Sequence, residues 1–550
     1  MAISPPSEHS LFKGVRGFIL HPVMNSIQLN LLISLLLVLF YNNSFWAEIG
    51  EISAQSQQDR FFLGSIFFLL LAFFNGCLSL VSFKYILKPC LILLVLIASF
   101  AAYFMKTYGV MIDQSMVKTV LTTDLKNISE LLSVKMLYYF VVLGLLPSLF
   151  VLRTEIRRKG FVRELFMVSG TVLMSLVCIV LILVLFYKDY ISLGRNYNYV
   201  RHLINPVSSL YAAGSSVKKN LAGGKLMVRP IGEDARVGKP WQERGKKNLV
   251  ILVVGEAARA QNFSLNGYAK KTNPALEKED VLNFTSMYSC GTASSVSLPC
   301  MFSHFGRDAF SEYKAQRHEG LLDVLSHAGV QVLWRDNNSG CKGVCDRVQT
   351  ESMANLCPLG ECQDMVLLEG IQQYLDESDG DTVIVLHQKG SYGPGYYRRS
   401  PPEFKAFLPE CTTNQLQECR AEELVNAYDN TILYTDYFLA QVIELLKTNS
   451  GQFNTAMLYL SAYGESLGEK NIYLHGLPYV IAPDEQKHVP FILWFATSFL
   501  EGNGLDRACL QKKLNDPLSH DTLFHSVLGL MGVKTVMLDK ELDIFADCRR

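Results

Sequence analysis

The sequence predicts two kinds of structure in one chain: an α-helical membrane domain of five spans, and an α/β domain whose mostly parallel central sheet is covered by helices on both faces. The chain has 550 residues, enough for more than one domain. It is 49% hydrophobic with a positive mean hydropathy, and the excess lies in its first third. Apolar runs there reach the length of about 20 residues that crosses a bilayer. Beyond residue 248, buried strands alternate with helical segments.

Five apolar runs form the expected spans: 27–46, 61–82, 86–106, 136–152 and 165–187. A buried core helix is the alternative interpretation of any one run, but five runs so close together favour a membrane domain. The first run has no small-residue cleavage site, so we expect an uncleaved anchor.

Positive charges set the expected orientation of these spans, because cytoplasmic loops carry the excess of lysine and arginine. They cluster before the first span, between the second and third, and after the fourth: Lys13, Arg16, Lys84, Lys88, Arg153, Arg157, Arg158, Lys159 and Arg163. The 47–60 loop is acidic and faces outward. Five spans that start inside leave the C-terminal domain outside the cytoplasm.

Cysteine use indicates an oxidising compartment for that domain. Three of the 13 cysteines lie in the spans and the other ten lie beyond residue 248. Close spacing predicts four local disulfides and leaves a fifth pair: Cys290 with Cys300, Cys341 with Cys345, Cys357 with Cys362, Cys411 with Cys419, and Cys509 with Cys548. A zinc site is the rival interpretation of Cys341 and Cys345, although no histidine or second cysteine pair stands at finger spacing. A bacterial inner membrane, with the C-terminal domain in the periplasm, fits these observations.

The chain divides into three expected segments: a membrane domain over 1–187, an interfacial connector and linker over 188–247, and the α/β domain over 248–550. Tyrosines at the start of the connector are typical of a membrane interface. Gly, Ser and Lys in 213–226 are typical of a flexible linker. The net charge is zero, so nothing electrostatic points to a nucleic-acid partner.

Buried strands are expected at 248–254, 382–387 and 456–461, with helices at 319–328 and 421–447 between them. Alternation of strand, loop and helix predicts a mostly parallel sheet with both faces covered. In such sheets, ligands bind at the carboxyl ends of the strands. A polar or glycine-rich loop follows each strand, so we expect the functional site there.

Two residues in such loops could carry chemistry. Glu256 follows the first strand, and a carboxylate at a strand tip suits a divalent metal, although a capping or ion-paired glutamate is the alternative. Thr292 precedes a serine-rich helix start, where its hydroxyl could lie beside a phosphate or act as a metal-activated nucleophile. A helix N-cap is the alternative for Thr292. A disulfide between Cys290 and Cys300 would brace this loop.

Six segments in order carry a resemblance to a known family. They are VVGEAARAQNFSLNGY (253–268), SCGTASSVSLPCMFS (289–303), WRDNNSGCKGVCDRV (334–348), LHQKGSYGPGYYRRSPPEF (386–404), YDNTILYTD (428–436) and YLHGLPYVIAP (473–483). Together they resemble the bacterial lipid A phosphoethanolamine transferases, a polymyxin-resistance family in the alkaline phosphatase/sulfatase superfamily. The resemblance covers essentially the full chain, so a sulfatase-like fold is expected for 248–550.

The resemblance implies transfer of phosphoethanolamine from the membrane lipid phosphatidylethanolamine to a phosphate of lipid A. It implies an intermediate on Thr292 and a zinc ion held by Glu256, Thr292 and a consecutive Asp-His pair. It places Lys342 near the substrate, and His475 at the phosphoryl group or a second zinc.

The chain departs from the family at these positions. Ala462 and Tyr463 stand where the family has the Asp-His pair, and Tyr392 replaces the histidine of a G-S-H-G-P motif. Between the third and fourth spans the family has Asn, Thr and Glu at four-residue steps, thought to line the lipid site. This chain has Thr119, Thr123 and Asn127 there, so only the threonine at 123 matches.

These departures bear on zinc binding. A catalytic zinc usually takes three protein ligands. Ala462 offers no donor atom, and tyrosine phenols with a pKa near 10 are weak neutral ligands. Glu465, in the same loop, is the one candidate for a substitute ligand.

Two functional interpretations follow. In the favoured one, the chain is a transferase homologue with lost or impaired zinc-dependent catalysis that acts as a lipid-binding or regulatory protein. The alternative is an active phosphoethanolamine transferase with a non-standard metal site, which modifies lipid A or another envelope glycan. The sequence names no protein partner.

Overall fold

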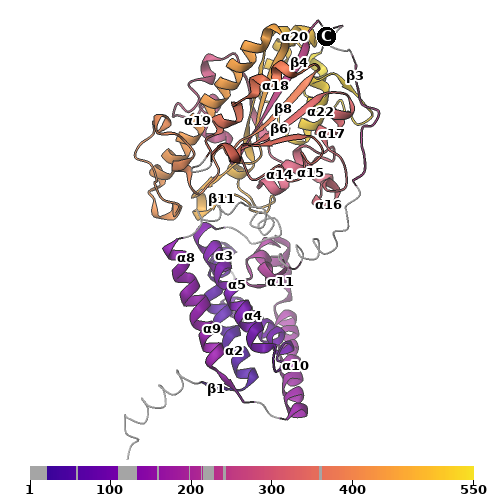
Figure 1. The fold of residues 1–550 in the computed structure, drawn as a ribbon. Coiled ribbons are helices and arrows are strands. Elements are labelled where there is room, and N and C mark those ends of the chain that lie inside the picture. The colour runs from indigo at the N-terminus through magenta and orange to yellow at the C-terminus, as the bar shows by residue number, and fades with distance from the viewer. Residues whose placement is uncertain are drawn as a thin grey trace, which may run out of the picture. The chain divides into compact units, whose positions relative to one another are not determined.

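The computed structural model describes residues 22–56, 60–109, 133–157, 160–196, 198–211, 214, 228–238, 243, 245–357 and 362–549. They form two compact units, one within 22–214 and the other within 228–549 (Figure 1). Thr119, Thr123 and Asn127, and all of the expected 213–226 linker except residue 214, lie outside the described residues.

The first unit is helical and apolar. Its described residues include four helices long and apolar enough to cross a membrane: α4 (Arg60–Leu80), α5 (Leu87–Tyr108), the continuous stretch Val134–Arg153, and α10 (Phe161–Leu185). The stretch Val134–Arg153 consists of α8 (Val134–Tyr139), the π-helix η2 (Phe140–Leu145) and α9 (Leu146–Arg153). The second to fifth predicted spans correspond to these helices.

The predicted first span is a bent helix pair. Helix α2 (Ser26–Leu36) continues as η1 (Leu37–Tyr41), and α3 (Asn43–Ser56) follows after a bend of 62°. The side chain of Asn42 at the bend donates to the carbonyl oxygens of Leu37 and Asn205 at 2.9 and 2.7 Å and accepts from Asn205 N–H. This polar pairing replaces helix hydrogen bonds at the break. The prediction of a loop over 47–60 is therefore wrong for residues 47–56, which belong to helix α3.

The second unit is built on an eight-stranded sheet in the order β13-β5-β12-β9-β4-β8-β6-β7. The central strands β4 (Lys247–Gly255), β8 (Thr382–His387) and β9 (Phe453–Ser461) are mutually parallel, with β4 in the middle. The outer strands are β5 (Leu282–Tyr288), β6 (Gln331–Asp336), β7 (Gln349–Ser352), β12 (His488–Phe495) and β13 (Leu518–Ser519). Within this sheet, only β12 runs antiparallel to its neighbours. The prediction of a mostly parallel sheet is confirmed.

Helices cover both faces of this sheet. Along β4, Val250, Leu252 and Val254 belong to one apolar core, and Leu249, Ile251 and Val253 belong to the other. This alternation is the two-residue period of a strand buried on both faces. Figure 1 shows α19 (Ala421–Thr448) on one side and α17 (Leu321–His327) and α22 (Asp521–Leu530) on the other.

Shorter elements complete the two units. In the membrane unit they are β1 (Val23–Met24), β2 (Glu155–Ile156), α11 (Tyr187–Asn196) and η3 (Asn198–Leu203). In the second unit they include α14 (Ser294–Met301), α15 (Gly306–Ala309), α16 (Glu312–Ala315), α18 (Ile371–Glu377), α20 (Thr497–Gly502), α21 (Arg507–Lys512), β3 (Arg236–Val237), β10 (Ser466–Leu467), β11 (Tyr473–Leu474) and β14 (Val533–Lys534).

Five disulfides lie in the second unit, and they join the pairs that the sequence predicts. Cys290 is bonded to Cys300, Cys341 to Cys345, Cys357 to Cys362, Cys411 to Cys419, and Cys509 to Cys548. The first four bonds close local loops of 4 to 10 residues, whereas the bond between Cys509 and Cys548 spans 39 residues and ties α21 to the end of the described chain. All ten cysteines of this unit are therefore paired, as expected in an oxidising compartment.

Candidate active site

The candidate site lies at the carboxyl ends of β4, β8 and β9. Glu256 follows β4, His387 ends β8, and Ala462 and Tyr463 follow β9. Because β4 pairs in parallel with both of the other strands, these side chains meet at one edge of the sheet. The expected location of the site is therefore where the polar side chains converge.

Glu256 is the centre of this cluster, and only 1% of it is exposed. Its Oε1 accepts a hydrogen bond of 2.6 Å from the Tyr463 hydroxyl. Its Oε2 lies 3.7 Å from His387 Nε2 and has no hydrogen-bond partner. The Glu256 carbonyl oxygen accepts from Ser391 N–H at 2.9 Å, which draws the loop after β8 against it. That approach requires Gly390, because a Cβ there would lie 2.7 Å from the same oxygen.

His387 supplies the positive charge at this point. Burial lowers its pKa, but Asp336 at 2.9 Å from Nδ1, together with Glu256, raises it to about 9. Burial likewise raises the pKa of Glu256, yet His387 and the Tyr463 hydroxyl bring it below its usual value. At neutral pH the cluster therefore holds an imidazolium between two carboxylates. The sequence analysis did not predict this contact of His387 with Glu256.

Tyr463 is fully buried and acts as a hydrogen-bond donor. Burial and the nearby Glu256 carboxylate raise its pKa well above its ordinary value, so the phenol stays protonated. Its hydroxyl also lies 3.3 Å from His475 Nε2, and the two ring centroids are 4.4 Å apart. Tyr463 thus lies directly between Glu256 and His475.

His475 is held in turn by Glu465. Its Nδ1 lies 2.7 Å from Glu465 Oε2, and the other carboxylate oxygen accepts from Tyr396 Oη at 2.6 Å. Burial lowers the pKa of His475, but Glu465 and then Glu256 raise it overall. The ring of Tyr392 is 5.5 Å from that of His475. Glu465 is therefore committed to two partners, which disfavours its use as a substitute metal ligand.

Thr292 joins the cluster through the His475 loop. Its hydroxyl donates to the Leu477 carbonyl oxygen at 2.6 Å, and its own carbonyl oxygen accepts from Gly476 N–H at 2.9 Å. The N-cap position of α14 is Ala293, without a side-chain cap, so the N-cap alternative for Thr292 is wrong. The disulfide between Cys290 and Cys300 closes this loop.

His520 contacts the loop that carries Thr292, a role that the sequence did not indicate. Its Nδ1 accepts from Cys290 N–H at 3.2 Å, and its Nε2 donates to the Ser461 carbonyl oxygen at 3.1 Å. Burial lowers the pKa of His520 to about 3, in agreement with this neutral tautomer. His520 therefore ties the Thr292 loop to the end of β9.

Lys342 lies on the loop closed by the disulfide between Cys341 and Cys345. Its ammonium donates to Ser339 O and Oγ at 2.7 and 2.8 Å. The side chain lines a cavity of about 270 Å³ together with Phe305 and Arg347. The zinc interpretation of the cysteine pair is wrong, because the two sulfurs are bonded to each other.

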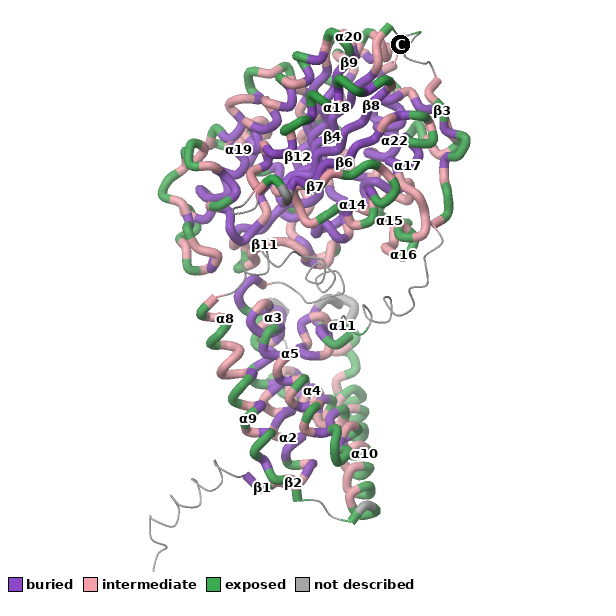
Figure 2. Tube along the Cα trace, in the orientation of Figure 1, coloured by how far each residue is buried: buried purple, intermediate pink, exposed green. Residues whose placement is uncertain are grey.

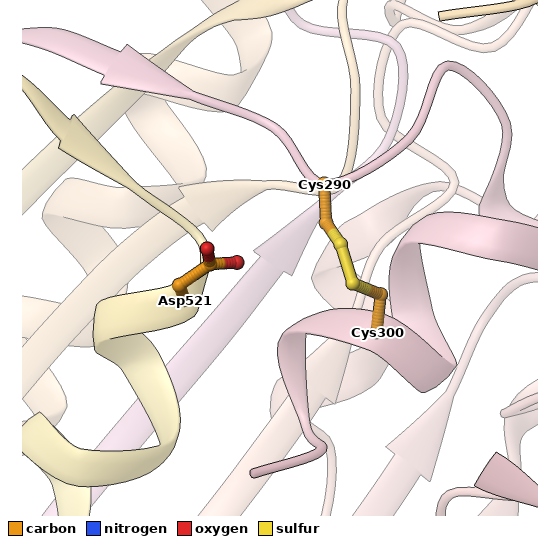
Figure 3. Close-up of side chains that lie close together, drawn as sticks. All are labelled: Cys290, Cys300 and Asp521. Atoms are coloured by element: carbon orange, nitrogen blue, oxygen red, sulfur yellow. A yellow bond between two sulfur atoms is a disulfide. The ribbon is translucent and has the colours of Figure 1, made fainter. Parts of the chain in front are cut away.

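The donor set does not fit zinc, the metal implied by the family resemblance. Ala462 contributes no donor, and the neutral Tyr463 hydroxyl already occupies Glu256 Oε1. Among the described residues, one group brings three His, Cys, Asp or Glu ligand atoms within 4.8 Å: Cys290, Cys300 and Asp521. Figure 3 shows that two of these three are the bonded disulfide, whose sulfurs cannot act as thiolates. The described residues thus provide no zinc site of the usual kind.

Fold and site together define a membrane-anchored protein of the sulfatase type. The family model described as Sulfatase matches residues 248–533, and the model described as Phosphoethanolamine transferase EptA/EptB matches residues 70–221. The chain belongs to the phosphoethanolamine transferase family of the alkaline phosphatase/sulfatase superfamily.

Two relatives support this membership over three quarters or more of the chain. Phosphoethanolamine transferase EptA of Escherichia coli (strain K12) is 42% identical over 535 residues, which cover 95% of this chain and 98% of that protein. Phosphatidylethanolamine transferase Mcr-1 of Escherichia coli is 39% identical over 433 residues, which cover 75% of this chain and 79% of that protein.

A solved structure agrees. The integral membrane lipooligosaccharide phosphoethanolamine transferase A from Neisseria meningitidis superimposes with a TM-score of 0.91 at 34% identity, covering 96% of this chain and all of that one. This chain is accordingly a multi-pass inner-membrane protein with a periplasmic C-terminal domain.

Proposed function

We propose that this chain is a phosphoethanolamine transferase homologue that has lost zinc-dependent catalysis, or retains it only in impaired form, and that acts as a lipid-binding or regulatory protein. Its relatives are named phosphoethanolamine transferases, which supports phosphatidylethanolamine and lipid A as its lipid partners. The single observation that carries the loss of catalysis is the hydrogen bond from Tyr463 to Glu256. The neutral Tyr463 hydroxyl lies against Glu256 Oε1, where a zinc ion bound to Glu256 would need further protein ligands.

The charges around Glu256 are balanced without a metal. His387 lies between Glu256 and Asp336, and His475 lies against Glu465. A zinc ion at Glu256 would face repulsion from the His387 imidazolium and would have to displace the Tyr463 hydroxyl. Each of the two carboxylates, Glu256 and Glu465, therefore has a protein partner of its own.

Thr292 also lacks the activation that a nucleophile needs. A threonine hydroxyl reacts well only when a base removes its proton or a metal lowers its pKa. The Thr292 hydroxyl instead donates to the Leu477 carbonyl oxygen, which is no base. This contact supports a Thr292 hydroxyl that stays protonated and does not act as a nucleophile.

Zinc content tests the proposal. We would purify the full-length chain in detergent and measure zinc per chain beside the double variant Ala462→Asp/Tyr463→His. The variant Ala462→Asp/Tyr463→Phe is the matched control, since it restores the carboxylate without the imidazole. We expect the native chain and the control to hold little zinc and the double revertant to gain about one ion. Stoichiometric zinc in the native chain would refute the loss of the metal site.

A second candidate, an active transferase with a non-standard metal site, is favoured by one feature. Glu256 Oε2 is buried, lies 3.7 Å from His387 Nε2, and has no hydrogen-bond partner. Mass spectrometry of lipid A from cells that express the native chain, with the Thr292→Ala variant as control, separates the two candidates. A gain of one phosphoethanolamine unit that depends on Thr292 would establish the active enzyme.

A further inference from the structure

The connection between α14 and α17 runs along the surface and forms one wall of the cavity of about 270 Å³ that Lys342 also lines. It contains two helices of four residues each, α15 and α16, neither of which has a buried residue. Figure 2 shows both as exposed and half-buried stretches of the second unit. Glu312, Ala315, Gln316 and His318 line the cavity from this side. The connection belongs to the second unit alone, and an inference about it does not rest on the proposed function.

His304 lies at the start of this connection and packs it against α22. Its ring centroid is 4.1 Å from that of Phe305 and 6.0 Å from that of Phe524 in α22. Its Nδ1 is buried and has no hydrogen-bond partner among the described residues. A neutral imidazole tolerates such a site, because its single N–H can be on Nε2. An imidazolium carries an N–H on both nitrogens, so protonation of His304 would bury an unpaired donor at Nδ1.

The groups that act on His304 electrostatically are all basic. The ring centroid of His318 is 6.2 Å from that of His304, Lys314 acts on it from α16, and His525 acts on it from α22. Burial first, and then these three groups, lower the pKa of His304 to about 4. The closed connection therefore holds His304 as the neutral ring.

The carboxylates of the neighbouring elements do not offset this repulsion. Other charged residues on these elements are Arg307, Asp308, Glu312, Arg317, Asp521 and Asp539. Asp539 and Asp521 act instead on His525, whose pKa burial lowers overall. Arg307 lies over the ring of Tyr479, with its guanidinium carbon 4.0 Å from the centroid. A proton on His304 would thus meet neighbouring bases and no compensating carboxylate.

We propose that residues 304–318 form a pH-sensitive flap over the cavity, closed when His304 is neutral and released when His304 is protonated. In the open flap, water accepts hydrogen bonds from both ring nitrogens, so the proton is taken up there first. The closed state is therefore fully stable above the pH at which a free histidine titrates, and it loses stability as the pH falls below it. Two four-residue helices without a buried residue can open locally while the sheet stays folded.

Two variants that do not titrate test the role of His304. His304→Phe keeps an aromatic ring against Phe305 and Phe524, and His304→Asn covers the case that the larger ring does not pack. His488→Phe is the matched control, because His488 is a half-buried histidine of the same unit whose ring stacks on that of Tyr288 at 5.2 Å.

Hydrogen exchange of the full-length chain in detergent, read by mass spectrometry of peptides from 302–320, measures flap opening at pH 7.5 and 5.0. Each rate is divided by the intrinsic rate of an unstructured peptide at the same pH. Wild type and His488→Phe are expected to open up to about 25-fold more at pH 5.0, the ratio given by a pKa of 6.5 in the open flap and about 4 in the closed one. Both His304 variants are expected to lose this acid response.

Peptides from α19 in the same samples report unfolding of the whole unit. Three results would overturn the flap. One is a wild type whose 302–320 peptides open equally at the two pH values. Another is an acid response of His304→Phe and His304→Asn as large as that of wild type, which would assign it to a different group. The third is an equal rise in the α19 peptides, which would show that the whole unit opens and not the flap.

Discussion

The substitution Tyr463→Phe removes one hydroxyl and no carbon atom, so it isolates the hydrogen bond to Glu256. That bond is 2.6 Å long, and both side chains are buried. A hydrogen bond to a charged group contributes about 1.5–3 kcal/mol. The second oxygen of Glu256 already lacks a hydrogen bond, so the variant would leave the buried carboxylate without any. We therefore expect the free energy of unfolding to fall by about 2–3 kcal/mol.

Tyr459→Phe is the matched control for this experiment. Tyr459 lies on β9, the strand that precedes Tyr463, and is equally buried, but its hydroxyl has no hydrogen-bond partner. Its removal should leave stability nearly unchanged or slightly higher. Thermal unfolding of the full-length chain in detergent measures both variants. At about 2 °C per kcal/mol for a domain of this size, Tyr463→Phe should lower the Tm by roughly 4–6 °C.

Equal melting temperatures for Tyr463→Phe, Tyr459→Phe and wild type would refute the argument. The carboxylate of Glu256 would then have another partner, and a bound cation would be the first to test. A loss in Tyr463→Phe that appears only when zinc is present would point to the same conclusion. Chelator treatment of wild type separates these cases, because the hydrogen-bonded network predicts no change in Tm on metal removal.

Two further predictions concern the frame of the site. Gly390→Ala places a Cβ 2.7 Å from the Glu256 carbonyl oxygen at φ +55, and should cost at least about 3 kcal/mol of unfolding free energy in a denaturant titration. Gly329→Ala, at φ +81 with no atom within 4 Å, should cost only about 1–2 kcal/mol, and equal losses would contradict the close approach. The pKa of His520 is about 3 in the fold against 6.5 when free, so the unfolded chain takes up the proton first and stability falls as the pH drops below 6.5. His520→Asn should remove up to roughly 1.4 kcal/mol per pH unit of that slope, and an unchanged pH profile would rule out a buried neutral imidazole.

Most of the fold could be predicted from the sequence because its signals are local. The expected strand over 382–387 and the expected helix over 421–447 agree with β8 and α19 to within one residue. A hydrophobic run of this kind indicates a buried helix or strand from its own residues, independent of its neighbours in the fold. The first span was harder, because its bend depends on Asn42 pairing with Asn205, which lies 163 residues further along the chain.

The candidate site was predicted in part. Glu256 lies at the strand tip where the sequence put it, and Ala462 and Tyr463 follow the neighbouring strand. The sequence treated Tyr463 as a lost ligand, whereas in the structure it is a hydrogen-bond donor to Glu256. The contact of His387 with Glu256 was not predicted, although a histidine at the end of the strand next to Glu256 was the signal that could have identified it.

The sequence by itself determined the membrane domain, the parallel sheet and the disulfide pairs. Each of these depends on residue type and on spacing along the chain. Only the tertiary structure decided the contacts of Glu256, because its partners Tyr463 and His387 belong to segments far apart in sequence.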